Sequence, residues 1–326
     1  MAGRVRVSGT GARVSRYFLG LDVGGTHAEA VVVDEAGHQL SRGHAPGAVL
    51  RAGSIDALVE AVTAAVADAV GPAGRELPAA ALWAGVAGAG REEVRARAEE
   101  ALVAAGLAEV VALGTDVEAA FESAFGEGPG LLLIAGTGSI ALGRAPDGRL
   151  ERVGGWGARL GDEGGGYWIG MQALGCIARA VDGRAQPTAL RELVLRRLEL
   201  DPPQALIAWV DAASKAEIAA LAPLVFEAAR SGDPVAASIT TDAAVALRSH
   251  VVALLDRIGQ SPERGRDRDP TELPLVFWGG LIGEDGWLRP IVQRLMEPLG
   301  LGPRNDPIDP AFGAARLAAR RVGASF

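Results

Sequence analysis

Cysteine is nearly absent from this sequence, which contains one, Cys176, among 326 residues. A single thiol forms no intrachain disulfide and no metal cage built from several cysteines. The composition therefore excludes a small secreted domain held together by disulfides. It fits a chain that works in a reducing compartment, and we expect the cytoplasm.

Long apolar runs are also missing. No uninterrupted apolar stretch reaches the roughly 18 residues that a membrane-spanning helix needs, so we expect no membrane partner. Residues 1–16 are basic and rich in glycine, but they lack the apolar core of a signal peptide. We predict that these residues form a flexible tail.

Positive charge is not in excess. Lys and Arg together number 32 and Asp and Glu number 40, which gives a net charge of −8. An acidic chain has no general attraction to a polyanion, and we therefore expect no nucleic-acid partner. A small nucleotide can still bind, because backbone N–H groups and a metal ion attract its phosphates locally.

What the sequence does contain is an alternation of strand and helix signals that predicts an α/β fold. Short apolar runs bounded by glycines predict strands, and amphipathic stretches preceded by capping residues predict helices. The predicted strands of the first half span 17–23, 28–34, 39–44, 79–86 and 109–113, and helices are predicted to begin near 54, 91 and 116. Three strands followed by alternating helices and strands complete one α/β layer system.

At Gly126–Gly130 the chain breaks and then repeats its opening theme of apolar strand, glycine turn and second apolar strand. This repetition predicts a duplicated architecture with two domains, over 17–125 and 126–310. Three further segments are predicted: mostly helix over 167–258, a solvated mixed-charge loop over 264–269, and a final helix within 311–326 that packs back on the first domain.

The two glycine turns are the first candidate site. The first turn contains Asp22, Gly24, Gly25 and Thr26, and the second contains Gly136, Thr137 and Gly138. Glycines let the backbone approach a phosphate closely, a threonine hydroxyl binds a phosphate oxygen, and a carboxylate binds Mg²⁺. Each turn alone is also compatible with a plain hairpin. Together they suggest a phosphate clamp, in which both turns bind the phosphates of one nucleotide.

Asp116 is the second candidate, because it stands where a predicted strand becomes a helix. Aspartate is favoured at the N-cap, so a purely structural capping role is one interpretation. The other is catalytic, since phosphoryl transfer to a hydroxyl needs a carboxylate that accepts the hydroxyl proton.

The glycine-rich stretch 153–170 is the third candidate, because neither helix nor strand explains so many glycines. Its candidate ligand contacts are Gly155, Trp156, Gly157 and Asp162. Tryptophan offers an apolar face and aspartate offers hydrogen-bond acceptors for hydroxyl groups. The alternative is a structural loop in which Asp162 and Glu163 cap the next helix.

A second glycine pair, Gly279 and Gly280, follows a late apolar strand. Such a pair suits close packing against a flat base or ribose, and it equally suits an ordinary junction between strand and helix.

Taken in this order, the turns GLDVGGT and IAGTGS, Asp116 and the stretch GGWGARLGDEGGGYW resemble the BadF/BadG/BcrA/BcrD-type ATPase family, in its N-acetylglucosamine kinase branch. The resemblance runs from Phe18 to the C-terminal helix. It implies a two-domain, actin-like ATPase (ribonuclease H-like) fold with a duplicated strand–Gly-turn–strand core and an interdomain cleft. It also implies ATP-dependent phosphorylation of an amino sugar, most of all N-acetylglucosamine to its 6-phosphate, by a homodimer.

The resemblance assigns a role to each candidate residue. ATP phosphates would be bound by Gly24, Gly25, Thr26, Gly136, Thr137 and Gly138, and adenosine by Gly279, Gly280 and Ala229. Asp22 would bind Mg²⁺ through water, and Asp116 would be the base on the sugar hydroxyl. The sugar would be bound by Asp116, Gly155, Trp156, Gly157 and Asp162.

One departure from the family leaves the sugar open. The kinases often carry an asparagine on the loop after the third strand, but the comparable loop here, 44–49, has none. Glucosamine or N-acetylmuramic acid are therefore alternative substrates. Two other classes also stay open: an activator ATPase of CoA-ester reductases and dehydratases, which the single Cys176 disfavours, and a non-catalytic sugar sensor.

Overall fold

The structure is a computed structural model that describes residues 16–260 and 273–326. The chain forms two compact units, which are described separately below. The first runs to Gly126 and is completed by Ile308–Phe326, and the second is Glu127–Pro307. The predicted tail, apart from its last residue, and the predicted loop at 264–269 lie outside the described residues.

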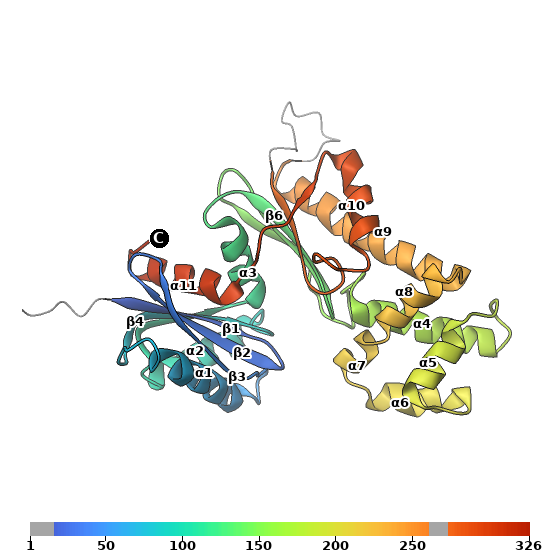
Figure 1. Ribbon diagram of the computed structural model, residues 1–326, viewed down its shortest axis with the longest axis horizontal. Helices are drawn as coiled ribbons and strands as arrows, with labels where there is room; N and C mark the ends of the chain where they lie inside the picture. Colours follow the sequence, from blue (N-terminus) through green and yellow to red (C-terminus); the bar gives the residue numbers. More distant parts are fainter. Residues whose placement is uncertain (1–15, 261–272) are drawn as a thin grey trace, which may run out of the picture. The chain divides into compact units, whose positions relative to one another are not determined.

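The first unit is a five-stranded sheet with helices on both faces (Figure 1). Its strands are β1 (Tyr17–Val23), β2 (His27–Asp34), β3 (Gln39–Pro46), β4 (Ala79–Val86) and β5 (Ala108–Gly114). Its helices are α1 (Ile55–Val70), α2 (Glu92–Ala104), α3 (Asp116–Phe125) and α11 (Pro310–Arg321). The strand order is β3-β2-β1-β4-β5, in which the first three are antiparallel and β4 and β5 run parallel to β1.

The core of the first unit follows from the apolar strand β1, which is buried on both faces. Leu19, Leu21 and Val23 pack with α1 and its neighbours, whereas Phe18 packs with α11. Helices therefore cover both sides of the sheet: α1 and α2 lie on one face and α11 on the other (Figure 1).

Gly20 is where α11 comes closest to β1. A Cβ atom at this position would lie 2.1 Å from the carbonyl oxygen of Ala311 and 2.2 Å from the amide nitrogen of Ala315. Both obstacles are helix backbone and neither can rotate away. Glycine therefore sets how closely the final helix packs on the sheet.

We expect Gly20→Ala to destabilise the protein strongly. Overpacking a core typically costs about 1–3 kcal/mol, and backbone obstacles place this change at or above the upper end. Thermal unfolding would measure the loss. Gly53→Ala is the matched control, because a Cβ atom there meets no atom within 4 Å. Equal melting temperatures for the two variants would contradict this account of the packing.

The second unit repeats the same plan around a second five-stranded sheet. Its strands are β6 (Gly130–Ala135), β7 (Ser139–Arg144), β8 (Leu150–Gly154), β9 (Leu275–Trp278) and β10 (Pro303–Arg304). Its helices are α4 (Gly166–Val181), α5 (Leu190–Leu198), α6 (Leu206–Ala212), α7 (Lys215–Ala219), α8 (Ala222–Arg230), α9 (Pro234–Arg257) and α10 (Arg289–Met296), with short 3₁₀ turns η1 (Pro203–Ala205) and η4 (Glu297–Leu299).

The duplication predicted from the two glycine turns is confirmed by the topology. In the second sheet the order is β10-β9-β6-β7-β8, with β6, β7 and β8 antiparallel and β9 parallel to β6. This arrangement matches β1, β2, β3 and β4 of the first sheet. In both sheets the glycine turn connects the central strand to its antiparallel neighbour.

Within the described ranges, none of the helices combines the length and the apolar composition needed to cross a membrane.

Candidate active site

The first glycine turn connects β1 to β2 at one end of the first sheet. The amide of Gly24 donates to the carbonyl of His27 (2.9 Å), which closes the turn. Gly25 and Thr26 are exposed, and the Thr26 hydroxyl lies 2.9 Å from Nδ1 of His27. The turn thus presents backbone and a hydroxyl group to solvent directly after Asp22.

Asp116 is the first residue of α3 and does not cap it. The cap is Thr115, whose hydroxyl accepts from the amide of Glu118 (3.2 Å), while the Glu118 carboxylate accepts from the amide of Thr115 (2.7 Å). This reciprocal pair is a capping box. The interpretation of Asp116 as the N-cap is therefore wrong, and its carboxylate is not needed to begin the helix.

Burial raises the pKa of Asp116 above its ordinary value, and the neighbouring Glu118 adds to the rise. The Asp116 carboxylate accepts one hydrogen bond, from the amide of Val117 (3.1 Å). A carboxyl group with a raised pKa is a stronger proton acceptor once it is ionised, which suits a general base.

Asp22 lies near Asp116 at the same end of the sheet. Glycine makes this approach possible, because Gly85 on β4 stands beside Asp22 in the register and a Cβ atom at Gly85 would lie 3.3 Å from Cα of Asp116. Burial first of all, and then the charges of Asp116, Glu29 and Asp309, together raise the pKa of Asp22 to about 7. Several carboxylates therefore gather at this edge.

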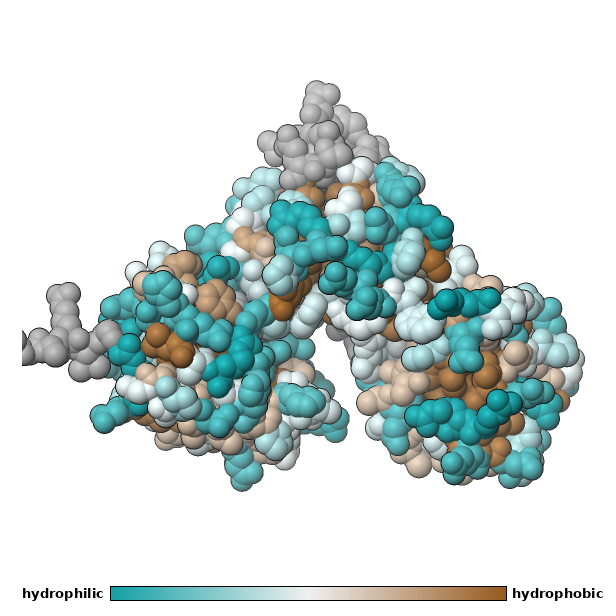
Figure 2. All heavy atoms as spheres, viewed as in Figure 1, coloured by the Kyte–Doolittle hydropathy of each residue, from teal (hydrophilic) through white to brown (hydrophobic). Residues whose placement is uncertain are grey.

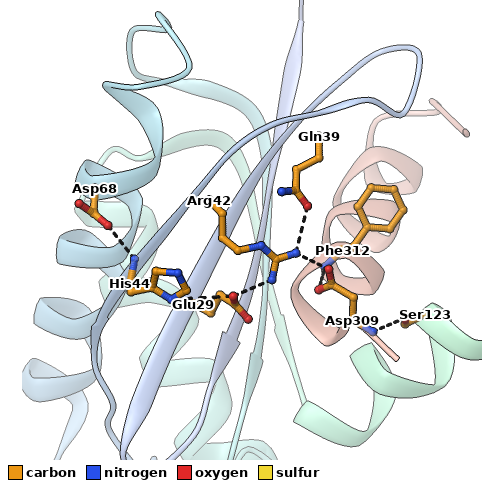
Figure 3. Close-up of polar contacts among 8 residues, drawn as sticks. All are labelled: Glu29, Gln39, Arg42, His44, Asp68, Ser123, Asp309 and Phe312. Carbon is orange, nitrogen blue, oxygen red and sulfur yellow. Dashed lines mark hydrogen bonds and ion pairs between the residues drawn. The ribbon is translucent and has the colours of Figure 1, made fainter. Parts of the chain in front are cut away.

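Arg42 on β3 binds two of those carboxylates (Figure 3). Its guanidinium donates to Glu29 (2.6 Å), to the side-chain oxygen of Gln39 (3.0 Å) and to the carboxylate of Asp309. Asp309 in turn caps α11 by accepting from the amide of Phe312 (3.0 Å). Arg42 thus neutralises Glu29 and Asp309 and links the sheet to α11, but no bond joins it to Asp22.

The second glycine turn connects β6 to β7 in the second unit. Its carbonyls are bound by the start of α4: the amide of Gly166 donates to Gly136 (2.8 Å) and that of Tyr167 to Thr137 (3.0 Å). Thr137 is exposed. Because its carbonyls are engaged in this way, the turn has a defined conformation and leaves the threonine side chain to solvent.

Asp162 lies directly against this second turn. A Cβ atom at Gly138 would lie 2.6 Å from Oδ2 of Asp162, so only glycine leaves room for the carboxylate. Asp162 has a left-handed backbone (φ 60°), and its carboxylate binds Nζ of Lys215 at 2.6 Å. The following helix α4 has Gly165 as its N-cap and no side-chain cap, so the capping interpretation of Asp162 and Glu163 is wrong.

The other predicted contacts of the glycine-rich stretch lie on the loop between β8 and α4. Gly155 donates its amide to the carbonyl of Ser139 (3.1 Å) beside the second turn. Trp156 is 68% exposed, and the guanidinium of Arg152 lies 5.9 Å from its ring centroid. Gly157 has a positive φ of 85°. An exposed indole on a turn made by glycines is available to a ligand.

Gly279 and Gly280 also reach the second turn. A Cβ atom at Gly279 (φ 97°) would lie 2.5 Å from the carbonyl oxygen of Ala135, and Gly280 is exposed with no atom within 4 Å of such a Cβ. Ala229 lies on α8, whose Phe226 stacks on Trp287 at 5.8 Å. The loop that carries the glycine pair is thereby packed against α8.

With these elements placed, the chain can be compared with known proteins. Residues 19–318 match the BadF/BadG/BcrA/BcrD ATPase family. The chain belongs to this family. The family and the two-domain, actin-like α/β fold predicted from the sequence are confirmed.

Two curated relatives and one solved structure of similar length resemble this member of the BadF/BadG/BcrA/BcrD family. An N-acetyl-D-glucosamine kinase of Dictyostelium discoideum is 31% identical over 92% of this chain and 97% of its own length. An N-acetylmuramic acid/N-acetylglucosamine kinase of Clostridium acetobutylicum is 30% identical over 84% and 88%. A crystal structure from Chromobacterium violaceum, provisionally named an N-acetylglucosamine kinase, has a TM-score of 0.75 at 30% identity and covers 92% and 98%.

Because ATPases commonly bind their nucleotide together with Mg²⁺, the first glycine turn is a candidate site for this cation. No group of three or more His, Cys, Asp or Glu within residues 16–260 and 273–326 is arranged to bind a metal by itself. Mg²⁺ in nucleotide sites typically takes one or two carboxylates and completes its shell with phosphate oxygens and waters. Asp22, crowded by other carboxylates and unpaired with Arg42, fits that requirement.

Several residues that shape the site of this family member were not predicted from the sequence: Glu29, Arg42, Gly85, Lys215 and Asp309. On the loop 44–49, Ala48 is 8% exposed and packs in the core of the first unit beside Leu50. The family resemblance linked this loop to the sugar through an asparagine, which this chain lacks. An asparagine at Ala48 would bury its amide in an apolar cluster.

An apolar pocket of about 420 Å³ lies elsewhere in the second unit, between the later part of α4 and α6. Figure 2 shows apolar side chains gathered on this part of the unit. The pocket is lined chiefly by Leu174, Ile177, Val181, Leu206, Ile207 and Val210. None of the candidate site residues lines it.

Proposed function

We propose that this member of the BadF/BadG/BcrA/BcrD family is a kinase that transfers the γ-phosphoryl group of ATP to a hydroxyl of an amino sugar, N-acetylglucosamine first of all, giving the 6-phosphate. The observation that carries the proposal is the capping box of Thr115 and Glu118, which releases the Asp116 carboxylate from any role in starting α3. That carboxylate stands beside Asp22 at the glycine turn. The relatives whose names state this activity cover nearly the whole chain.

Asp116 is the base in this proposal. It accepts the proton of the attacking sugar hydroxyl as the oxygen approaches phosphorus, which increases the nucleophilicity of that oxygen. Its raised pKa favours this transfer, because a proton acceptor works best when its pKa lies closer to the working pH.

The two glycine turns bind the phosphates of ATP. Gly24, Gly25 and Thr26 provide one set of backbone amides and a hydroxyl, and Gly136, Thr137 and Gly138 provide the other. Gly279, Gly280 and Ala229 bind adenosine. Asp22 binds Mg²⁺ through water, and the ion when bound neutralises charge on the phosphates.

The sugar is bound by Asp116 and by the glycine-rich loop. Trp156 offers an exposed ring face to the apolar side of the sugar, Asp162 accepts hydrogen bonds from its hydroxyls, and Gly155 and Gly157 let the loop approach it. Since no asparagine stands on loop 44–49, glucosamine and N-acetylmuramic acid remain alternative substrates.

The rival activity within the same family is that of an activator ATPase in electron transfer. The single Cys176 argues against it, because clusters of the 4Fe–4S kind are held by four thiolates. Cys176 lies on α4, where its sulfur accepts a hydrogen bond from Arg179 (3.1 Å). An iron assay and an ultraviolet–visible spectrum separate this rival from the kinase. A non-catalytic sugar sensor would bind sugar without producing ADP.

A coupled ADP-release assay over N-acetylglucosamine, glucosamine, N-acetylmuramic acid and glucose tests the proposal. We expect rapid ADP release with N-acetylglucosamine and little with glucose. Release that no amino sugar stimulates would contradict the proposal. We also propose that the protein is cytoplasmic and works as a homodimer, which fractionation and sedimentation would check.

Thr26→Val and Thr137→Val should each weaken ATP binding more than sugar binding. Both hydroxyls are exposed at glycine turns, and each variant removes one hydrogen bond to a phosphate oxygen, worth roughly tenfold in the KM for ATP when the acceptor is charged. Steady-state kinetics with each substrate varied would show it. An unchanged KM for ATP in both variants would contradict the two-turn clamp.

A further inference from the structure

Lys215 is the only lysine in the chain, although the chain has 32 basic residues. It is the first residue of α7, and Ser214 caps that helix by accepting from the amide of Glu217 (3.2 Å). The Lys215 side chain is 42% exposed, yet its Nζ reaches the carboxylate of Asp162, whose side chain is 5% exposed. The only lysine of the chain therefore forms an ion pair with a buried acid, Asp162, beside the second glycine turn.

The two carboxylate oxygens of Asp162 have different surroundings. Oδ2 binds Nζ of Lys215 at 2.6 Å. Oδ1 accepts no hydrogen bond from any residue in the described parts of the chain, and it is not sealed from solvent. The carboxylate is fixed by the lysine, by the left-handed backbone of Asp162 and by contact with Gly138. One oxygen of a rigidly placed acid is therefore left to accept a hydrogen bond.

An arginine in this chain shows how a guanidinium can occupy both oxygens of an acid. Arg320 donates one N–H to each carboxylate oxygen of Glu122. Other arginines bind one oxygen only, as Arg184 does when it donates two N–H groups to Oδ2 of Asp182. A guanidinium is a planar fork that matches both oxygens of a carboxylate, whereas an ammonium is a compact point charge.

We infer that Lys215 is a positioning residue of the sugar site: it binds one oxygen of Asp162 and leaves the other oxygen for a sugar hydroxyl, and the site requires lysine rather than arginine for this reason. The inference rests on the proposed function, in which Asp162 binds the sugar. To that function the inference adds Lys215, which orients the Asp162 carboxylate and leaves one of its two oxygens free to accept a hydrogen bond from the sugar.

A purely structural ion pair would make a different prediction. If Lys215 only neutralised a buried acid, arginine would serve equally well, because it keeps the charge and the hydrogen bond. In the positioning account, the guanidinium of Lys215→Arg spans both oxygens and competes with the sugar. The arginine variant therefore separates the two explanations while it preserves the ion pair.

The experiment measures steady-state kinetics and melting temperatures of Lys215→Arg, Asp162→Ala and the double variant. We expect Lys215→Arg to raise the KM for the sugar by about tenfold or more, because a hydrogen bond to a charged acceptor is lost, with the KM for ATP and the melting temperature nearly unchanged. In the Asp162→Ala background the arginine should have no further effect, since Lys215 acts through Asp162. Arg257→Lys is the matched control: its partner is Glu151 (2.9 Å) in the same unit, and its sugar kinetics should stay at wild-type values.

The outcomes separate this inference from the proposed function. A raised KM for the sugar in Asp162→Ala, together with wild-type kinetics in Lys215→Arg, would overturn the positioning role alone. Unchanged kinetics in Asp162→Ala would remove Asp162 from the sugar site altogether.

A second measurement uses the unmodified protein and does not depend on the folding of a variant. Because Lys215 is the only lysine, an amine-acylating reagent modifies one side chain, and peptide mass spectrometry compares it with the N-terminal amine. We expect saturating sugar to slow acylation of Lys215 several-fold relative to the N-terminus. An unchanged ratio would overturn the inference.

Discussion

Asp116→Asn should lower kcat by about 10²–10⁴-fold, the usual contribution of a general base, and should leave the melting temperature close to that of the wild type. The amide cannot accept the sugar proton. The helix start survives the change, because Thr115 and Glu118 form the capping box without Asp116. Coupled ADP release and thermal unfolding, measured on the same preparation, give both numbers.

Thr115→Ala is the matched control for this prediction. It removes the cap and should cost stability of about 1 kcal/mol, with a much smaller effect on kcat than Asp116→Asn has. The two neighbouring residues should thus show opposite patterns, one catalytic and one structural. Unchanged turnover in Asp116→Asn would show that Asp116 is not the base. A large loss of stability in that variant would show that Asp116 has a structural role.

Asp22→Asn should stabilise the protein at neutral and alkaline pH while it impairs turnover. Burial and the nearby carboxylates raise the pKa of Asp22 to about 7 from its ordinary value of 3.8. The ionised form is therefore unfavourable in the folded state. A difference of about three pKa units corresponds to at most about 4 kcal/mol of folding free energy, which the neutral amide would recover in part.

The sign of the pH dependence follows from the raised pKa. The contribution of Asp22 to stability is fully present below pH 4, where the carboxyl is protonated in both the folded and the unfolded chain, and it is lost as the pH rises through about 7. The melting temperature of Asp22→Asn minus that of the wild type should therefore increase between pH 4 and pH 8. Mg²⁺ with nucleotide should raise the melting temperature of the wild type more than that of the variant. A melting-temperature difference that does not change with pH would contradict the raised pKa of Asp22.

The α/β architecture was predictable because its signals are local. Apolar strands that end in glycine turns mark β1 and β6, and their repetition in the two halves of the chain predicts the duplicated sheets that the structure has. The starts of α1, α2 and α3 were predicted to within one residue, but the residues that cap them were less predictable. Ser54 precedes α1 without capping it, since its hydroxyl donates to the carbonyl of Val49 (2.7 Å).

The unpredicted parts of the site depend on contacts between residues far apart in the sequence. Arg42 meets Asp309 across 267 positions, and Lys215 meets Asp162 across 53. No hydrophobic periodicity or sequence motif predicts such pairs. Lys215 carried the one usable signal, because a chain that uses arginine almost everywhere else has a single lysine. Ala48 shows the converse case, in which one residue of the loop that the family resemblance linked to the sugar packs into the core.

The central claim is that the phosphoryl group of ATP reaches a sugar and not water. Mass spectrometry of a reaction with ATP, Mg²⁺ and N-acetylglucosamine, together with ADP quantification, tests this most directly. The account predicts one sugar monophosphate for each ADP, and almost none from Asp116→Asn. ADP accompanied by inorganic phosphate and unmodified sugar would contradict it.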